Sequence, residues 1–189
     1  LQQIHKKGLL VQDHRVAPYC PRCGTGLSDH ELAQGYETVT DPSVYVRFPV
    51  TSGPIAEHGA SLLVWTTTPW TLISNTAIAV NPKVEYSLIE LTISGNKENG
   101  NKEDKENTEA NVKVEKVLIA SQLAPVLGGE QKVIATYLGK ELEHTTYSRP
   151  FDYLDIPHSH FVVLADYVTI EDGTGLVHQA PAFGADDLQ

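Results

Sequence analysis

Short apolar runs, each closed by a polar residue, proline or glycine, dominate the sequence from Tyr36 onward. Runs of this length rich in β-branched residues are typical of strands, and proline cannot donate a backbone hydrogen bond to a sheet. Strands are expected at Val44–Val50, Ser61–Thr68, Thr76–Val80, Tyr86–Ile93, Val117–Ala120, Val133–Leu138, Phe161–Ala165, Tyr167–Ile170 and Leu176–His178. Short helices are expected at Leu1–Lys7, Ser28–Ala33 and Ser121–Leu127. The pattern predicts a mainly β protein with short helices (α+β), in which residues 36–189 form a closed or nearly closed β-barrel with small peripheral helices.

Residues 94–116 interrupt this pattern with a run of Asn, Lys and Glu that lacks aromatic side chains. Its five lysines nearly balance its six acidic residues, so charge repulsion within it is mild. A segment of this composition cannot supply a core. We therefore interpret it as a polar, low-complexity insertion at the tip of a hairpin.

The formal net charge of −10 argues against a surface that binds nucleic acid on its own, because phosphate contacts need clustered Lys and Arg. It still allows a pocket presented to a nucleic acid that is held elsewhere. No apolar run approaches the roughly 20 residues of a membrane span, and no signal peptide is recognisable. A soluble, cytoplasmic monomer without a membrane partner is therefore expected. Because the chain begins with Leu1 and includes no methionine, we interpret it as a fragment of a larger protein.

Residues 1–35 form a loop-rich connecting segment around a single C-P-R-C-G knuckle, which contains Cys20 and Cys23. A tetrahedral zinc site needs four ligands, so this pair is either half of a zinc ribbon or a redox pair. His14 and His30 lie near it in the sequence, but their spacing is not a recognised zinc pattern. No metal or other cofactor is therefore assigned to this chain by itself.

Two segments carry polar side chains that a strand or a core seldom needs. The first, W-T-T-T-P-W-T-L-I-S-N at 65–75, offers three adjacent neutral hydroxyls. The second is G-T-G-L-V-H-Q-A-P-A-F-G-A-D-D at 173–187. Each has a purely structural explanation: a strand face, a core histidine at His178, and a helix start at Asp186. The segments are far apart in the sequence, so only tertiary structure can bring them together.

Together these segments resemble the editing insertion of the class I aminoacyl-tRNA synthetases for isoleucine, valine and leucine. The resemblance extends through YCPRCGTGLSDHE, DPSVYVRFPV, LVWTTTPWTL, NTAIAV and DGTGLVHQAPAFGADD, and it leaves out residues 94–116. Valyl and leucyl members tend to carry Thr-Arg-Pro where this chain has Thr67-Thr68-Pro69. They also lack the His-x-Ala-Pro that is found here at His178–Pro181. The chain is therefore most similar to the isoleucyl type.

The resemblance implies hydrolysis of misacylated valyl-tRNA(Ile), with water attacking the aminoacyl ester. A pocket that accepts isoleucine rejects valine only weakly, because one methylene is worth about 1–3 kcal/mol, a limit usually illustrated with this very pair of amino acids. A second pocket that admits valine and excludes isoleucine restores fidelity. The implied partners are the 3′ end of misacylated tRNA(Ile) and the rest of the synthetase chain. Zinc would belong to the full-length enzyme, where relatives carry a second CxxC.

The same resemblance implies roles for single residues. Asp187 would bind the α-ammonium group of the substrate, and Thr66, Thr67 and Thr68 would bind ribose and ester oxygens. His178 would line the side-chain pocket and limit its size, while its use as a general base stays open. Further substrate contacts are expected at Trp65, Asn75, Gly173, Thr174, Gly175 and Phe183. No residue is placed as a covalent nucleophile, so direct attack by water is expected, with hydroxyls and backbone amides stabilising the oxyanion.

Three alternatives stay open at this point. The chain is an editing domain of a valyl or leucyl type, a non-catalytic β-barrel and zinc-ribbon binding module, or a free-standing hydrolase of misacylated tRNA. The Thr-Thr-Thr-Pro-Trp run opposes the first, and the acidic charge opposes a nucleic-acid-binding version of the second. Since the HIGH and KMSKS signatures are absent from this sequence, ATP binding and aminoacylation would belong to the full-length enzyme alone.

Overall fold

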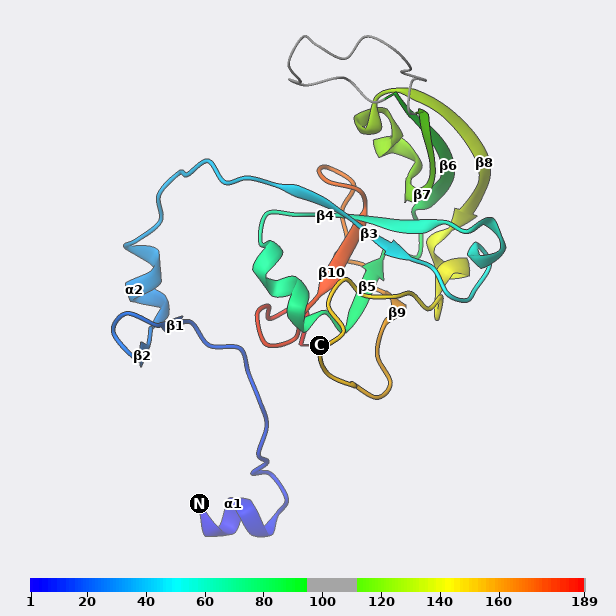
Figure 1. Cartoon of the computed structure of the whole chain (residues 1–189). Coiled ribbons are helices and arrows are strands. Elements are labelled where there is room, and N and C mark those ends of the chain that lie inside the picture. Colours follow the sequence, from blue (N-terminus) through cyan, green and yellow to red (C-terminus); the bar gives the residue numbers. More distant parts are fainter. Residues whose placement is uncertain (95–111, 189) are drawn as a thin grey trace. The chain divides into compact units, whose positions relative to one another are not determined.

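The computed structural model describes residues 1–94 and 112–188 (Figure 1). The chain divides into two compact units. The smaller unit combines Leu1–Thr40 with Ala180–Gln189, and the larger unit consists of Asp41–Gln179. Both ends of the larger unit therefore lead into the smaller one.

The smaller unit carries four short elements: α1 (Gln2–Lys6), β1 (Tyr19–Cys20), β2 (Thr25–Gly26) and α2 (Asp29–Ala33). Strands β1 and β2 pair antiparallel, so the cysteine knuckle lies at the turn between them. Helix α2 begins with a capping box: the Glu31 backbone N–H donates to the Ser28 hydroxyl, and the Ser28 N–H donates to the Glu31 carboxylate at 2.8 Å. These bonds satisfy backbone donors that a helix start leaves open, which explains why a helix this short forms at the predicted place.

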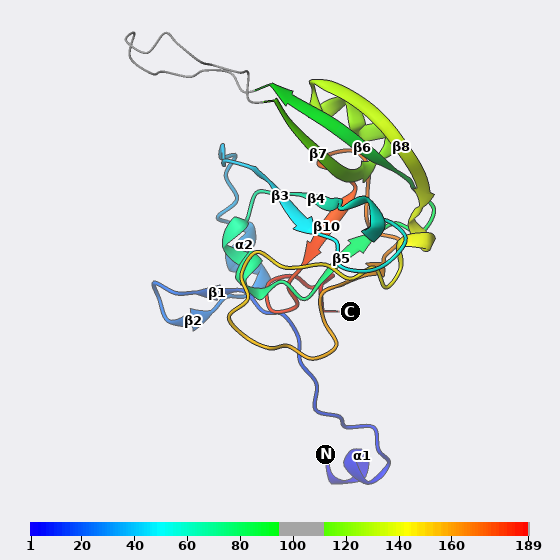
Figure 2. The same cartoon turned by 45° about the vertical axis from the view of Figure 1, so that its right-hand side comes forward.

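The larger unit contains a five-stranded sheet with the order β3-β4-β7-β6-β8. Its strands are β3 (Val44–Pro49), β4 (Ser61–Thr66), β6 (Glu85–Ser94), β7 (Val112–Ala120) and β8 (Glu130–Leu138). The pairings are antiparallel except that of β4 with β7, which run parallel. In Figure 2 the strands β6, β7 and β8 curve together as one twisted ribbon.

A second, three-stranded sheet has the order β10-β5-β9, formed by β5 (Ala77–Val80), β9 (Phe161–Leu164) and β10 (Leu176–Gln179). Strand β10 pairs antiparallel with β5, and this register sets His178 opposite Ile78. Four short 3₁₀ helices connect strands of the unit: η1 (Ala56–His58), η2 (Pro69–Ser74), η3 (Ser121–Leu127) and η4 (Gly139–Leu142). The short helix expected at Ser121–Leu127 is therefore confirmed, as a 3₁₀ helix.

One core joins the two sheets. Phe48, Leu62 and Val64 from β3 and β4 are buried together with Ile78 from β5 and Leu118 from β7. Successive residues of a strand face opposite sides of a sheet. For this reason Leu62 and Val64 enter this core, while Leu63 between them joins a second apolar cluster with Ile89, Val117 and Ile119.

The mainly β fold class is confirmed, but the closed barrel is not found in the described residues, where the strands form separate open sheets. The strand expected at Tyr167–Ile170 is also wrong. The Asn81 side chain donates to the backbone carbonyls of Asp166 and Val168, at 3.2 and 3.0 Å, and the Val168 N–H donates to the Ala165 carbonyl. These bonds hold the segment as a turn and take the place of a strand partner.

Strands β6 and β7 also extend into the segment expected to be an insertion. Strand β6 continues to Ser94, and β7 begins at Val112, so residues 112–116 pair with β6 and belong to the sheet. The Glu115 carboxylate on β7 pairs with Lys113 and with Arg47 on β3. The rest of the expected insertion, residues 95–111, lies outside the described residues.

Candidate functional site

The threonine run forms a sharp corner between β4 and η2. Strand β4 ends at Thr66, and Pro69 begins η2, where its missing N–H costs no helical hydrogen bond. The Thr68 backbone N–H donates to the Thr66 hydroxyl at 3.0 Å, and the two hydroxyls lie 3.2 Å apart. Thr66 is buried, whereas Thr67 and Thr68 are exposed. The corner therefore presents hydroxyls at the surface while one hydroxyl beneath them holds the backbone.

A depression of about 280 Å³ lies where this corner meets the loop before β10. One side is formed by Trp65, Thr66 and Thr67, and the other includes the Gly173–Gly175 loop. The remaining lining residues are Thr169, Asp172, Leu176 and Val177. Parts of the two polar segments thus come together here, whereas the predicted site residues Thr68, Asn75 and His178 do not line the depression.

The two glycines of this loop are required by the local geometry. Gly173 has φ +76°, and a Cβ at this position would lie 3.0 Å from the Trp65 ring. Gly175 has φ +73°, and its Cβ would lie 2.6 Å from the Cβ of Ala120 on β7. The Tyr86 hydroxyl donates to the Gly175 carbonyl at 2.7 Å. Glycine alone accepts this conformation without strain and without a clash against the neighbouring strands.

His178 lies beneath the corner, with only 9% of its surface exposed. Its Nε2 is 2.9 Å from the Thr71 hydroxyl, which also donates to the Thr68 carbonyl at 2.8 Å. Its Nδ1 is 2.8 Å from the Asn75 side-chain amide nitrogen. Both ring nitrogens are therefore occupied by protein groups, and one of them leads back to the threonine corner.

Tyr147 completes this network from the opposite side. Its hydroxyl donates to the Asn75 Oδ1 at 2.7 Å, and its ring packs edge-on against Phe48, with 5.3 Å between the ring centroids. Burial raises the pKa of Tyr147 well above its ordinary value, so the phenol keeps its proton. His160 contacts the same region, because its Nε2 lies 3.2 Å from the Asn75 carbonyl. Burial lowers the pKa of His160.

Asp187 and Phe183 belong to the smaller unit and are described within it. The Ala180 backbone N–H donates to the Asp187 carboxylate at 3.0 Å, and Phe183 is exposed. Gly184 leaves room for that carboxylate, since a Cβ there would lie 2.9 Å from Asp187 Oδ2. The helix expected to start at Asp186 is wrong: residues 181–188 form turns, closed by the bond of Ala180 to Asp187.

Comparison of the sequence with known proteins shows which family the chain belongs to. No protein-family model matches the chain. Over its whole length it is 56% identical to the isoleucine–tRNA ligase of Thermobifida fusca and 57% identical to that of Streptomyces coelicolor. The chain belongs to the isoleucine–tRNA ligase family. It spans 16% of the length of these two relatives.

A solved structure supports the fold. The P. knowlesi cytosolic leucyl-tRNA synthetase editing domain matches with a TM-score of 0.58 and 14% identity, covering 82% of this chain and 63% of that one. At this identity the likeness concerns the fold. This segment of the isoleucine–tRNA ligase family thus shares its fold with an editing domain of a leucyl-tRNA synthetase.

The two cysteines of the knuckle are both free thiols. Cys20 is partly buried and Cys23 is exposed, and the Cys23 N–H donates to the Cys20 sulfur at 3.4 Å. Hydrogen bonds from Cys23 lower the pKa of the Cys20 thiol. Among the described residues, no third His, Cys, Asp or Glu gathers with them to complete a ligand set. Two thiolates do not fill a tetrahedral zinc site, so no chemistry is assigned to zinc in this segment.

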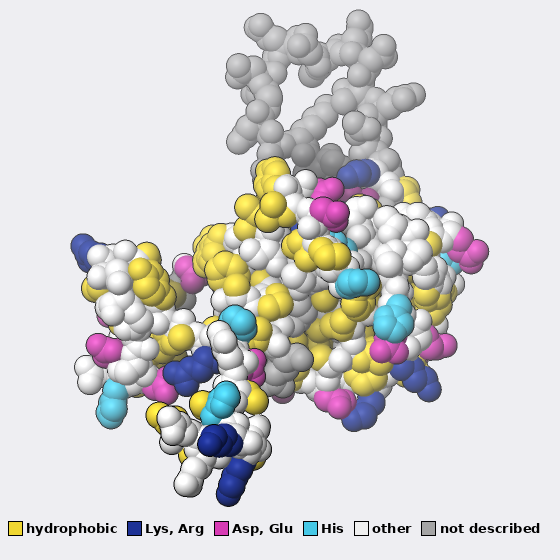
Figure 3. All heavy atoms as spheres, turned by 90° about the horizontal axis from the view of Figure 1, so that it is seen from below, with side chains coloured by type: hydrophobic (Ala, Val, Ile, Leu, Met, Phe, Trp, Pro, Cys, Tyr) yellow, Lys and Arg dark blue, Asp and Glu magenta, His cyan; other side chains and the backbone are white. Residues whose placement is uncertain are grey.

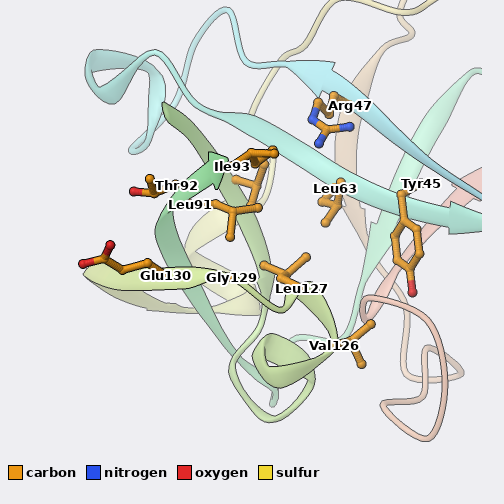
Figure 4. A pocket seen from close by; sticks show the side chains of 11 residues that line it. Tyr45, Arg47, Leu63, Leu91, Thr92, Ile93, Val126, Leu127, Gly129 and Glu130 are labelled. Carbon is orange, nitrogen blue, oxygen red and sulfur yellow. The ribbon is translucent and has the colours of Figure 1, made fainter. Parts of the chain in front are cut away.

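A larger hollow of about 480 Å³ lies away from the threonine corner. Figure 4 shows Tyr45, Arg47 and Leu63, from β3 and β4, across from Val126 and Leu127. Its walls are mainly aliphatic, and the Arg47 guanidinium is already paired with a carboxylate of β7. The hollow therefore combines an aliphatic lining with the side chains of Tyr45 and Thr92 and with Gly129, and it lacks the adjacent threonines and the Gly173–Gly175 loop found at the depression.

The distribution of basic side chains on the larger unit is consistent with the net negative charge of the chain. On the face in Figure 3, its Lys and Arg side chains lie singly among acidic side chains and histidines and do not form a broad basic patch. None of the helices in the described residues has the length and apolar character needed to cross a membrane.

Sequence reasoning missed several residues that the structure places at the site, among them the apolar Leu176 and Val177. Thr71 and Tyr147 belong to the hydrogen-bond network, while Thr169 and Asp172 line the depression. Thr71 lies inside the W-T-T-T-P-W-T segment, and Asp172 directly precedes the G-T-G turn. Their closeness to these motifs could therefore have identified both as candidate site residues. Tyr147 lies 72 positions from Asn75, and no local pattern marks it.

Proposed function

We propose that this segment is the editing site of an isoleucyl-tRNA synthetase and hydrolyses valyl-tRNA(Ile). The observation that carries the proposal is the depression in which the exposed Thr67 and the buried Thr66 face the Gly173–Gly175 loop, with Thr68 next to them at the corner. An aminoacyl ester on a ribose offers several neutral oxygens, and hydroxyls bind them as donors or acceptors. The membership of the chain in the isoleucine–tRNA ligase family supports the same reaction.

The reaction is the attack of a water molecule on the ester carbonyl, with release of valine and of the ribose hydroxyl of the tRNA. Thr67 and Thr68 hold the ester and ribose oxygens, while Thr66 positions the corner beneath them. Hydroxyls and backbone amides stabilise the oxyanion of the tetrahedral intermediate. Trp65 and the glycine loop form the walls of the nucleotide site. The resemblance to the family adds Phe183 as an apolar contact to the substrate.

Charge and size decide which substrate enters. Asp187 binds the α-ammonium group, the only cation of the aminoacyl moiety. His178 does not line the depression itself; we propose that it limits the space for the amino acid side chain from beneath the threonine corner, so that valine fits and isoleucine does not. It is not the base, because both of its ring nitrogens already have protein partners. The 3′ end of tRNA(Ile) and the rest of the synthetase chain, where the cysteine knuckle would find further zinc ligands, are the partners of this segment.

The test is deacylation of valyl-tRNA(Ile) by the full-length synthetase that carries this segment. Thr67→Val removes one exposed hydroxyl and keeps the β-branched shape, and we expect about a tenfold loss of kcat/KM, the size expected for one hydrogen bond of about 1.5 kcal/mol. Thr136→Val is the matched control, since Thr136 is an exposed threonine of β8 outside the depression. Equal rates for both variants would contradict the proposed site.

Specificity is tested separately with non-hydrolysable valyl and isoleucyl analogues of the tRNA terminus, titrated by calorimetry. Binding of the valyl analogue alone is the expected result. Equal binding of both analogues would favour the valyl- or leucyl-type alternative. Binding of neither analogue by a folded sample would favour a non-catalytic module.

A further inference from the structure

Four buried or partly buried side chains connect the core of the larger unit to the threonine corner by consecutive hydrogen bonds. The chain runs from the Tyr147 hydroxyl to Asn75, then to His178, then to Thr71, and ends on the Thr68 carbonyl. The distances along it are 2.7, 2.8, 2.9 and 2.8 Å. We call this chain the tyrosine relay.

The direction of each hydrogen bond is fixed from both ends of the relay. At one end, the Asn75 amide nitrogen lies 2.9 Å from the Ala77 carbonyl, which can only accept, so this nitrogen also donates to His178 Nδ1. At the other end, the Thr68 carbonyl can only accept, so the Thr71 hydroxyl donates to it and accepts from His178 Nε2. The Thr71 end requires a proton on Nε2, and the Asn75 end requires an Nδ1 without a proton, so the two ends together specify a neutral imidazole protonated on Nε2.

Protonation of His178 would conflict with this arrangement. A proton on Nδ1 would face the donating amide of Asn75, and turning that amide would set its oxygen against the Ala77 carbonyl. Asn75 has no exposed surface and Tyr147 only 4%, so water cannot replace a lost partner easily. The other titratable and charged groups described around the relay are His160, against Asn75 and the Tyr147 ring, and Arg149, whose charge acts on both Tyr147 and His160.

We propose that Tyr147 and Asn75 are positioning residues that keep His178 neutral and thereby hold the Thr68 carbonyl at the corner. This inference deepens the proposed function, because it rests on the threonine corner being the editing site. Tyr147 acts through three intervening side chains and does not touch the depression. Its hydroxyl sets the amide of Asn75, and the amide sets the tautomer of His178.

The decisive variant is Tyr147→Phe, which removes the hydroxyl and keeps the ring against Phe48. Nitrogen-15 NMR of the histidine rings in this chain reports the tautomer directly. In the parent chain we expect His178 to show a protonated Nε2 and no titration between about pH 5 and 8, the range in which an ordinary histidine changes its charge. In Tyr147→Phe we expect His178 to titrate within that range.

Two further variants sharpen the test. Asn75→Asp replaces the amide donor with an acceptor, so it should stabilise a proton on Nδ1 and leave His178 charged at neutral pH. Tyr137→Phe, on β8 and outside the relay, should leave the His178 signals unchanged. In the full-length synthetase, Tyr147→Phe should lower kcat for deacylation about tenfold, leave KM unchanged and add a pH dependence between about pH 6 and 7.

The outcomes separate this inference from the proposed function. A parent His178 that titrates like a free imidazole, or that carries its proton on Nδ1, would overturn the relay. So would a Tyr147→Phe chain with unchanged His178 signals. The expected NMR result combined with absent deacylation in the parent enzyme would keep the relay and refute the editing function.

Discussion

Substitution of Gly175 by alanine tests whether the close packing of the glycine loop supports the larger unit. Gly175 has φ +73°, and a left-handed conformation costs a residue with a Cβ about 1–2 kcal/mol. The new methyl would also lie 2.6 Å from the Cβ of Ala120, on a strand in the middle of the sheet. Overpacking of this kind costs about 1–3 kcal/mol more. The total loss in the free energy of unfolding should be about 2–5 kcal/mol.

Gly59→Ala is a matched control. Gly59 has φ +61°, yet nothing lies within 4 Å of the position its Cβ would take. It should lose only the backbone contribution of about 1–2 kcal/mol. Urea titrations followed by circular dichroism measure both variants, and the melting temperature of Gly175→Ala should fall by about 4–20 °C for a chain of this size. Equal losses in the two variants would refute the argument from the Ala120 contact.

Two further predictions concern charge. Asp187→Ala should lower kcat/KM for deacylation by the full-length enzyme about 10- to 150-fold, as expected for the loss of a charge-assisted contact of about 1.5–3 kcal/mol. The control, Asp186→Ala, should have little effect on kcat/KM. Equal effects of the two substitutions would contradict the assignment to Asp187. Burial raises the pKa of Tyr86 to about 12, against about 10 in an unfolded chain, so the unfolded state loses this proton first as the pH rises. The free energy of unfolding should therefore fall as the pH rises above about 10. Urea titrations at several pH values between about 10 and 12 should show a smaller fall for Tyr86→Phe than for the parent chain. The same pH dependence in both chains would exclude Tyr86 as its cause.

Local patterns predicted most of the fold. Ser28 and Glu31 form the capping box that their spacing indicates, and Pro69 begins η2, although β4 already ends at Thr66, two residues earlier than expected. The closed barrel was not predictable in the same way, because closure depends on which strands pair across long stretches of sequence. The segment Tyr167–Ile170 has the composition of a strand, but a side chain from outside the segment, Asn81, takes the hydrogen bonds that a partner strand would make.

The residues of the candidate site also differ in whether the sequence alone could indicate them. The threonines and the glycine turn could be found because their residue types are unusual for a strand, and Thr66, Thr67 and the glycine turn line the same depression. Tyr147 could not be predicted, because no local sequence pattern distinguishes a single tyrosine outside any motif. Its role depends on a distance of 2.7 Å to a residue 72 positions away, which only the folded chain creates.

The strand order has a consequence for the timing of synthesis. Asn75 leaves the ribosome before both of its partners, since Tyr147 follows 72 positions later and His178 103 positions later. At a synthesis rate of about 5–20 residues per second, His178 is added about 5–20 s after Asn75. Until β10 pairs with β5, the amide of Asn75 and the hydroxyl of Thr71 lack their shared partner. A nascent chain stalled before residue 178 would therefore carry the threonine run without the support beneath it, so the corner would reach its final geometry only once the last strand of this segment has been made.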